Sequence, residues 1–218
     1  KYLCIKESLR SQMKYVTHFY TDFYWRTQYV GVLEMEYEGV HFYFVDSEFY
    51  FGGPWPYGNM YEDIEKFCFF SKAVLSILPL IGFKPDIIHC NDWQTALVPI
   101  YYSIFYANNE WYRGIKTIIT IHNIQYQGKY GKELVEDVLG IPKSENHILE
   151  YDDCVNLMKG AIETAHRVTT VSPTYAQEIL DPWYSHELDG ILRERSWKLT
   201  GILNGIDTVS YDPATDKD

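Results

Sequence analysis

Four short runs of apolar and β-branched residues, each ending abruptly in polar residues, constrain the fold of this chain more than any other feature. The clearest run covers residues 117–121 and stops at His122 and Asn123; similar runs lie at 85–93, 167–173 and 198–207. Continuous apolar sequence followed by polar residues is typical of a buried strand of a parallel sheet at the point where it emerges. Because open α/β sheets bind ligands beyond the carboxyl ends of their strands, these polar residues predict one shared site.

Helical patterns separate the runs. Apolar residues recur at helical spacing over residues 61–78, and further helices are expected at 93–107, 132–139, 155–165 and 173–180, with a loop and a polar helix over 181–196. Alternation of strand and helix over 85–205 predicts βαβ units with parallel pairing. Two runs of strand-forming residues, 29–37 and 40–46, flank Glu38–Gly39 and predict a β-hairpin. Residues 1–28 are expected to form loop and short helix, and residues 143–153 an irregular segment. We therefore expect an α/β fold that lacks its first βα unit.

Charge and composition exclude several partners. The net charge of −11 disfavours nucleic acid and anionic membrane, and a phosphate-bearing substrate would need basic groups from elsewhere. Hydrophobic residues make up 46% of the 218 residues, enough for a sizeable core. The 20 tyrosines would suit the faces of sugars or bases, but a tyrosine-rich core and surface is the favoured explanation.

The cysteines indicate a reducing compartment. Cys4, Cys68, Cys90 and Cys154 are far apart and form no Cys-x-x-Cys pair, which favours free thiols in a cytoplasmic protein. The longest apolar stretch, 73–83, is too short to span a bilayer, and no signal peptide is visible. Since the chain opens at Lys1 rather than at methionine, we expect a fragment of a longer protein.

Four side chains are candidates for chemistry because each lies just beyond a predicted strand: Asp92, His122, Asn123 and Asn204. Asp and Asn can hold sugar hydroxyls in several directions, and His can donate to one. Each also has a simpler explanation: Asp92 as a helix cap, His122 as a polar strand end, and Asn204 as a turn former before Gly205. Their convergence from several strands of one sheet edge favours a binding site.

Other chemistries have weaker support. His89, Asp92 and His122 are possible metal ligands by type, but no His-x-x-His spacing supports a metal site. Ser172 lacks the Gly-x-Ser-x-Gly elbow of a serine hydrolase. No Gly-x-Gly-x-x-Gly follows a strand, so a dinucleotide-dependent oxidoreductase would have no phosphate loop here.

Five consecutive segments resemble bacterial glycogen synthase and plant starch synthase: residues 84–97, 120–128, 167–179, 188–192 and 201–207. The resemblance covers nearly the whole chain. It implies a Rossmann-like parallel sheet with flanking helices plus the β-hairpin, as the amino-terminal domain of a two-domain, GT-B glycosyltransferase. It further implies a retaining glucosyltransferase that moves glucose from ADP-glucose to the non-reducing end of an α-1,4-glucan. No metal or other cofactor is expected.

The resemblance also implies roles for individual residues. It places Asp92, His122 and Asn123 around the transferred glucose and the acceptor, with His122 and Asp92 as the catalytic residues and Asn204 nearby.

Tyr57, in the Pro-Tyr-Gly loop, falls where the family has a tyrosine near the nucleotide. Trp93 is expected to contact substrate, with packing at a helix start as the alternative. His166 stands where relatives often have an acidic residue and is interpreted as a helix-end substitution without functional weight.

The same resemblance predicts what the chain lacks. The family's amino-terminal Lys-Thr-Gly-Gly-Leu-Gly-Asp loop is absent, and so is a second domain with the phosphate-binding Arg and Lys and the candidate catalytic Glu. We therefore expect residues 1–210 to form an incomplete amino-terminal, acceptor-side domain and 211–218 to begin the interdomain linker. Such a fragment would position substrate without catalysing transfer. The alternative function is a non-catalytic module that binds glucan or a partner through aromatic surface.

Overall fold

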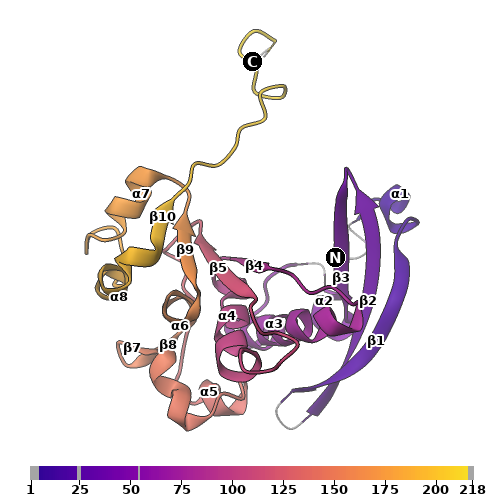
Figure 1. Ribbon diagram of the computed structural model, residues 1–218, viewed down its shortest axis with the longest axis horizontal. Helices are drawn as coiled ribbons and strands as arrows, with labels where there is room; N and C mark the ends of the chain where they lie inside the picture. Colours follow the sequence, from indigo (N-terminus) through magenta and orange to yellow (C-terminus); the bar gives the residue numbers. More distant parts are fainter. Residues whose placement is uncertain (1–4, 24–25, 54, 216–218) are drawn as a thin grey trace.

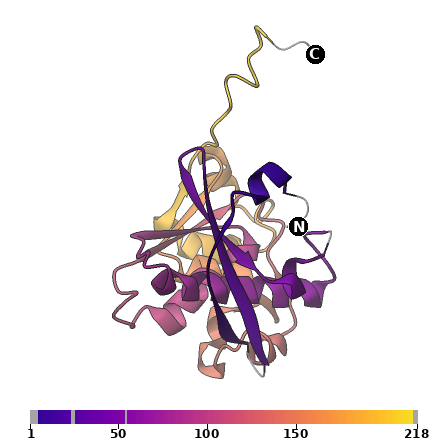
Figure 2. The same cartoon turned by 90° about the vertical axis from the view of Figure 1, so that its right-hand side faces the viewer.

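A computed structural model describes residues 5–23, 26–53 and 55–215 of the chain. Two larger sheets stand on either side of the long helix α3 (Met60–Leu80): an antiparallel sheet on the right of Figure 1 and a parallel sheet on the left. A 90° turn brings the antiparallel sheet to the front (Figure 2). A single apolar core runs through the molecule, from Val30 and Val32 of the antiparallel sheet, through α3, to Ile119 and Ile162 on the far side.

The parallel sheet confirms the prediction made from the four apolar runs. Its strand order is β10 (Leu199–Gly201), β9 (Arg167–Thr170), β5 (Lys116–Ile121) and β4 (Ile87–Asn91), and every neighbouring pair is parallel. Strand β5 lies inside the sheet, and its Ile119 and Ile121 are fully buried. Because all four strands point the same way, the polar residues that follow them lie at one edge.

The predicted hairpin is one part of a three-stranded antiparallel sheet. Strands β2 (Arg26–Tyr37) and β3 (Val40–Asp46) meet at Glu38 and Gly39, whose φ values of 50° and 77° are those of a tight hairpin turn. The expectation of loop and short helix over residues 1–28 is wrong for Lys14–Phe23, which forms strand β1 against β2. The reason is cross-strand pairing: Phe19 faces Val30, and both contribute to the packing against α3. Only the four-residue helix α1 (Glu7–Arg10) matches the expected helix.

Helix α3 confirms the helix predicted at 61–78. Asn59 caps it, since its side-chain oxygen accepts hydrogen bonds from the backbone N–H groups of Tyr61 (3.1 Å) and Glu62 (3.0 Å). The helix contacts β1, β3 and α4, and it therefore joins the two sheets.

The other helices are shorter than predicted. The expected helix over 93–107 is divided into a 3₁₀ turn (Trp93–Thr95), helix α4 (Leu97–Tyr101) and a π-helical turn (Tyr102–Tyr106). The segment 155–165 begins as strand rather than helix. The remaining elements are α2 (Glu48–Phe51), β6 (Lys129–Tyr130), α5 (Leu134–Asp137), a 3₁₀ helix (Lys143–Ile148), β7 (Glu150–Tyr151), β8 (Cys154–Asn156), α6 (Leu157–Thr164), α7 (Pro173–Glu178), α8 (Asp189–Glu194) and a 3₁₀ turn (Ser196–Lys198).

The sequence predicted free cysteines and no membrane-spanning segment. Of the four cysteines, Cys4 lies outside the described residues. Cys68, Cys90 and Cys154 are free thiols. Across the described ranges, no helix combines the length and apolar character that crossing a membrane requires.

Lys198 is buried at the junction between α6 and β10 and gives a testable prediction. Its ammonium group donates to the carbonyl oxygens of Glu163 (2.9 Å) and Ala165 (2.7 Å), and the residue is only 4% exposed. Burial lowers the pKa of Lys198 to about 8. Between this value and the ordinary 10.5, the unfolded chain binds more protons than the folded one, so stability contributed by this group rises with pH.

The free energy of unfolding of the unmodified protein should therefore rise relative to Lys198→Met from about pH 8 to pH 10.5, by at most about 1.4 kcal/mol per pH unit. Urea unfolding at several pH values measures this difference. Lys143→Met is the control, because the Lys143 side chain is 79% exposed and should leave the pH dependence unchanged. A difference that stays constant across this window would contradict the prediction.

Candidate functional site

The carboxyl end of β4 carries an unusual backbone conformation at Asp92. Its φ of 56° and ψ of −176° fall in a region that residues other than glycine rarely adopt, at a cost of roughly 1–3 kcal/mol. The backbone N–H of Asp92 still donates to the carbonyl of Thr120 on β5 (2.9 Å). The conformation therefore holds the residue against the neighbouring strand.

The Asp92 carboxylate joins the ends of β4 and β5. Its Oδ1 accepts a hydrogen bond from the backbone N–H of His122 at 2.8 Å. The interpretation of Asp92 as a helix cap is wrong, because its side chain accepts no capping hydrogen bond from the turn that follows. Thr95 steadies that turn instead: its hydroxyl accepts from the Asn91 N–H (2.7 Å) and donates to the Asn91 carbonyl (2.8 Å).

The ring of His122, which follows β5, contacts the end of β4. Its Nε2 lies 3.0 Å from Oδ1 of Asn91, and since an amide oxygen only accepts, this contact places the proton on Nε2. In the neutral imidazole, Nδ1 is then an acceptor. The structure thus brings Asp92 and His122 together as the sequence predicted, and it adds Asn91, which sequence reasoning missed although it ends the same strand.

Asn123 shapes the loop that leaves β5. Its side-chain oxygen accepts from the backbone N–H of Gln125 (3.0 Å), a local turn that asparagine favours. The next residue, Ile124, donates its N–H to the hydroxyl of Tyr175 on α7 (3.2 Å). Tyr175 is a second residue that sequence reasoning missed; it anchors the loop to a helix some 50 residues away in sequence.

The ring of Trp93 packs against other aromatic side chains at the edge of the site. Its ring lies edge-on to Phe67 of α3, with centroids 5.1 Å apart, and 6.2 Å from Tyr130 of β6. Gly128 lies against this ring: its φ is 66°, and a Cβ there would approach Trp93 Cε3 to 2.9 Å. These contacts are those expected if Trp93 serves in packing, the alternative to a contact with substrate.

Tyr57 connects the loop before α3 to the turn after β4. Its hydroxyl accepts a hydrogen bond from Nε2 of Gln94 (2.8 Å), and its ring packs 6.2 Å from Phe67. Its side chain is otherwise exposed. Tyr57 thus reaches the neighbourhood of Asp92 and Trp93 from a distant part of the sequence.

Asn204 lies at the same sheet edge but apart from the other candidates. It is exposed in the segment that follows β10, and β9 separates β10 from β5. Neighbouring strands are about 4.8 Å apart, so two strand spacings separate the end of β10 from that of β5. The structure does not join Asn204 to Asp92 or His122.

The residues considered for a metal site or a serine hydrolase make structural hydrogen bonds instead. His89 Nε2 lies 2.6 Å from the hydroxyl of Thr120, and Ser172 caps α7 by accepting from the Tyr175 N–H (2.8 Å). Within the described part of the chain, no group of three or more His, Cys, Asp and Glu side chains is placed to hold a metal ion. Burial raises the pKa of the Cys90 thiol to about 12, so it stays protonated near neutral pH.

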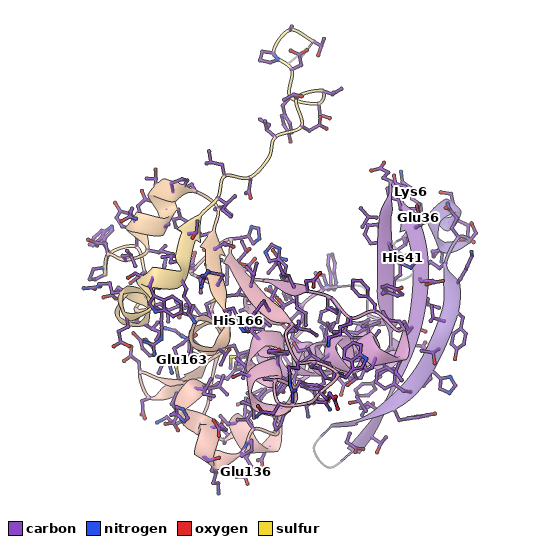
Figure 3. All side chains as sticks on the ribbon, in the orientation of Figure 1. Lys6, Glu36, His41, Glu136, Glu163 and His166 are labelled. Atoms are coloured by element: carbon purple, nitrogen blue, oxygen red, sulfur yellow. The ribbon has the colours of Figure 1, made fainter. Side chains whose placement is uncertain are left out.

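His166 lies away from the candidate site. It precedes β9 and so belongs to the amino end of the parallel sheet, whereas Glu36 and His41 lie on the antiparallel sheet (Figure 3). Its Nδ1 accepts from the Thr117 N–H (3.1 Å), and burial together with nearby Lys116 lowers its pKa. Its contacts are those of a neutral, structural histidine.

Comparison with known proteins agrees with this arrangement of strands. Residues 1–194 match the family described as starch synthase catalytic domain. The chain belongs to this family. A glycogen synthase of Lachnospira eligens is 56% identical over 220 residues, covering all of this chain and 46% of the relative. A glycogen synthase of Clostridioides difficile is 46% identical over 223 residues, with the same coverage.

Among solved structures, the catalytic domain of starch synthase IV from Arabidopsis thaliana, bound to ADP and acarbose, has a TM-score of 0.81 and 34% identity. The match covers 94% of this chain and 43% of that one. The chain therefore spans slightly less than half the length of these members of the starch synthase family. Its fold is that of an amino-terminal GT-B glycosyltransferase domain.

The contact between Gly128 and Trp93 can be tested by stability. Gly128→Ala should lower the free energy of unfolding by roughly 2–4 kcal/mol, because it adds both a strained φ and a clash with the Trp93 ring. Gly39→Ala is a matched control: its φ is also positive, at 77°, but nothing lies within 4 Å of the added Cβ, so the loss should be about 1–2 kcal/mol. Equal losses in urea unfolding would show that the ring does not require glycine.

Proposed function

We propose that the protein containing this chain transfers glucose from ADP-glucose to the non-reducing end of an α-1,4-glucan with retention of configuration. Membership of the starch synthase family supports this activity, and so do relatives named glycogen synthase. The neighbouring starch synthase IV structure holds ADP, the nucleotide that transfer from ADP-glucose would release. The observation that carries the proposal is the fixed pairing of Asp92 with His122 at the strand ends.

His122 and Asp92 would act on the transferred glucose. One carboxylate oxygen of Asp92 is used by the His122 N–H, and this bond fixes where the carboxylate charge sits. Retaining transfer builds positive, oxocarbenium-like charge on the sugar as the diphosphate leaves, and a preorganised carboxylate stabilises such charge. The imidazole, oriented by Asn91, would hold a glucose hydroxyl beside it.

The remaining candidates would bind substrate around this pair. Asn123 follows His122 directly, and Asn204 lies at the same sheet edge. Tyr57 and Trp93 offer aromatic surface at the turn after β4, with Tyr57 near the nucleotide. We place the glucan acceptor on this half of the enzyme and infer no metal or other cofactor.

The diphosphate would be bound mainly by groups outside these 218 residues. With a net charge of −11, this chain repels a nucleotide anion over long range. We therefore infer a second, carboxy-terminal domain that supplies basic groups across a cleft. On this view residues 1–210 are the acceptor-side domain of a cytoplasmic enzyme. The linker would begin at 211–218; the described part of this tail extends away from the body (Figure 1).

Two substitutions test the site in the full-length protein. His122→Ala and Asp92→Asn should each lower kcat for incorporation of glucose from ADP-glucose into glycogen about a hundredfold, as expected when a positioned polar group is lost. Asp92→Asn is the sharper variant, because its amide oxygen can still accept from the His122 N–H and only the charge is removed. His147→Ala, an exposed histidine outside the site, should leave turnover unchanged.

Normal turnover in both site variants would refute these roles. A protein that binds glycogen but transfers no glucose, even at full length, would instead support the non-catalytic, glucan-binding module.

A further inference from the structure

Gln127 is a buried polar residue in the loop that leaves β5, a few positions after His122. Only 4% of it is exposed. A buried side-chain amide is costly unless its donors and its acceptor are hydrogen-bonded, so its partners show which parts of the molecule it holds together.

Both the nitrogen and the oxygen of the Gln127 amide have partners. Nε2 donates to the carbonyl oxygen of Ile124 in the same loop (3.0 Å) and to that of His186, 59 positions further along the chain (2.8 Å). Oε1 accepts from Nδ2 of Asn156, which precedes α6 (2.7 Å). One side chain thus joins the loop 122–128, the connection between α7 and α8, and the start of α6.

Asn156 fixes the position of Gln127 from the side of α6. It is fully buried, and its Oδ1 caps the helix by accepting from the backbone N–H of Lys159 (3.0 Å). Because this oxygen faces the helix, the amide nitrogen is free to donate to Gln127. The backbone reinforces the contact, since the N–H of Met158 donates to the Gln127 carbonyl (3.0 Å). Gln127 is therefore held against the capped end of a helix.

The segment at His186 has a strained backbone. His186 and Glu187 have consecutive positive φ values of 48° and 78°, which residues other than glycine adopt rarely and at a cost. The carbonyl groups of both residues accept from other segments: that of His186 from Gln127, and that of Glu187 from the Tyr151 hydroxyl (2.8 Å). An ion pair joins the Glu187 carboxylate to Lys129. These contacts offset the cost of the strained pair.

The second donated bond of Gln127 closes the loop that carries His122 and Asn123. The Asn123 carbonyl accepts from the Tyr126 N–H (3.2 Å), and the Ile124 carbonyl accepts from the Gln127 side chain. His122 and Asn123 lie at the start of this closed turn, so a shift of the turn displaces both. A displacement of about 1 Å at a reacting site can lower a rate about a hundredfold.

We propose that Gln127 is a positioning residue for glucose transfer, which holds His122 and Asn123 in place through its two donated hydrogen bonds. The bond to His186 couples their loop to the strained segment between α7 and α8. The inference rests on the proposed transferase function, in which His122 and Asn123 act on the sugar. Because Gln127 is buried, its loss lowers kcat by displacing these residues and leaves the affinity for ADP-glucose nearly unchanged.

Two substitutions in the full-length protein remove the donated bonds. Gln127→Met has a side chain of similar size without an N–H donor, and Gln127→Glu can still accept from Asn156 but donates nothing when ionised. Each should lower kcat about tenfold near about pH 8 and change the KM for ADP-glucose less than about twofold. Burial raises the pKa of a carboxyl, and the protonated form donates one bond again, so the loss in Gln127→Glu should shrink to about threefold near about pH 6. The loss in Gln127→Met should be the same at both pH values.

The comparison of these two variants separates the new carboxyl from the groups already present. Titratable residues on the segments packed around position 127 are Lys129, Tyr151, Cys154, Lys159, His186 and Glu187. They are the same in Gln127→Met and Gln127→Glu, so a difference between the variants reports the new carboxyl. Gln177→Met and Gln177→Glu, at an exposed glutamine of α7, are the matched controls and should leave kcat unchanged.

Amide hydrogen exchange measures the coupling without any substrate. Gln127→Met should speed exchange about tenfold in peptides from 122–128 and also in peptides from 181–188, because local opening of either segment no longer breaks the shared bond. Peptides from β9 should be unchanged, and so should all of these peptides in Gln177→Met.

Unchanged kcat in both Gln127 variants would overturn the positioning role. A loss in Gln127→Glu that does not change with pH would overturn it too, because the donated bonds would then be unimportant. Faster exchange confined to 122–128 would overturn the coupling to His186. A full-length protein that transfers no glucose would refute the proposed function instead, and exchange in 181–188 would still decide whether Gln127 couples the two segments.

Discussion

The hydrogen bond from the backbone N–H of His122 to the carboxylate of Asp92 is the contact on which the candidate site depends. It joins two loops that follow neighbouring parallel strands, and it does so with a charged acceptor, which makes it stronger than a neutral bond. The bond also offsets part of the cost of the Asp92 backbone conformation. Without it, the ends of β4 and β5 would still be joined by the backbone contact between Asp92 and Thr120 and by the contact of the His122 ring with Asn91.

Helix α3 packs beside the contact between Asp92 and His122 and supplies Phe67 to the aromatic side chains next to it. One face of the helix packs in the core, its first turn carries Glu62 and Asp63, and Phe67 lies between Tyr57 and Trp93. The antiparallel sheet packs on the same helix, so residues from before position 60 reach a site built on strands that begin at position 87. The aromatic residues of the chain thus lie in the core, in one wall of the site and on the exposed surface, the antiparallel sheet included.

Much of this arrangement could be predicted from local sequence. The apolar runs identified β4, β5, β9 and β10, and the polar residues after them identified Asp92 and His122, because strand burial and the parallel order follow from residue type. Strand β1 was missed because its pairing with β2 is a tertiary contact, although its alternation of aromatic and β-branched residues was visible. The continuous helix over 93–107 was wrong since Asp92 and Thr95 impose a turn that periodicity does not reveal. Contacts such as Asn91 with His122, or Tyr57 with Gln94, join residues more than 30 positions apart, and no local pattern encodes them.

Position 92 carries two opposed demands. Its backbone geometry suits glycine, whereas its side chain must accept a hydrogen bond, which glycine cannot do. Only a short acceptor such as Asp or Asn meets both in part, and bulky apolar residues fail on both counts. A deep mutational scan should therefore find this codon among the least permissive in the chain, even though the residue is only half buried.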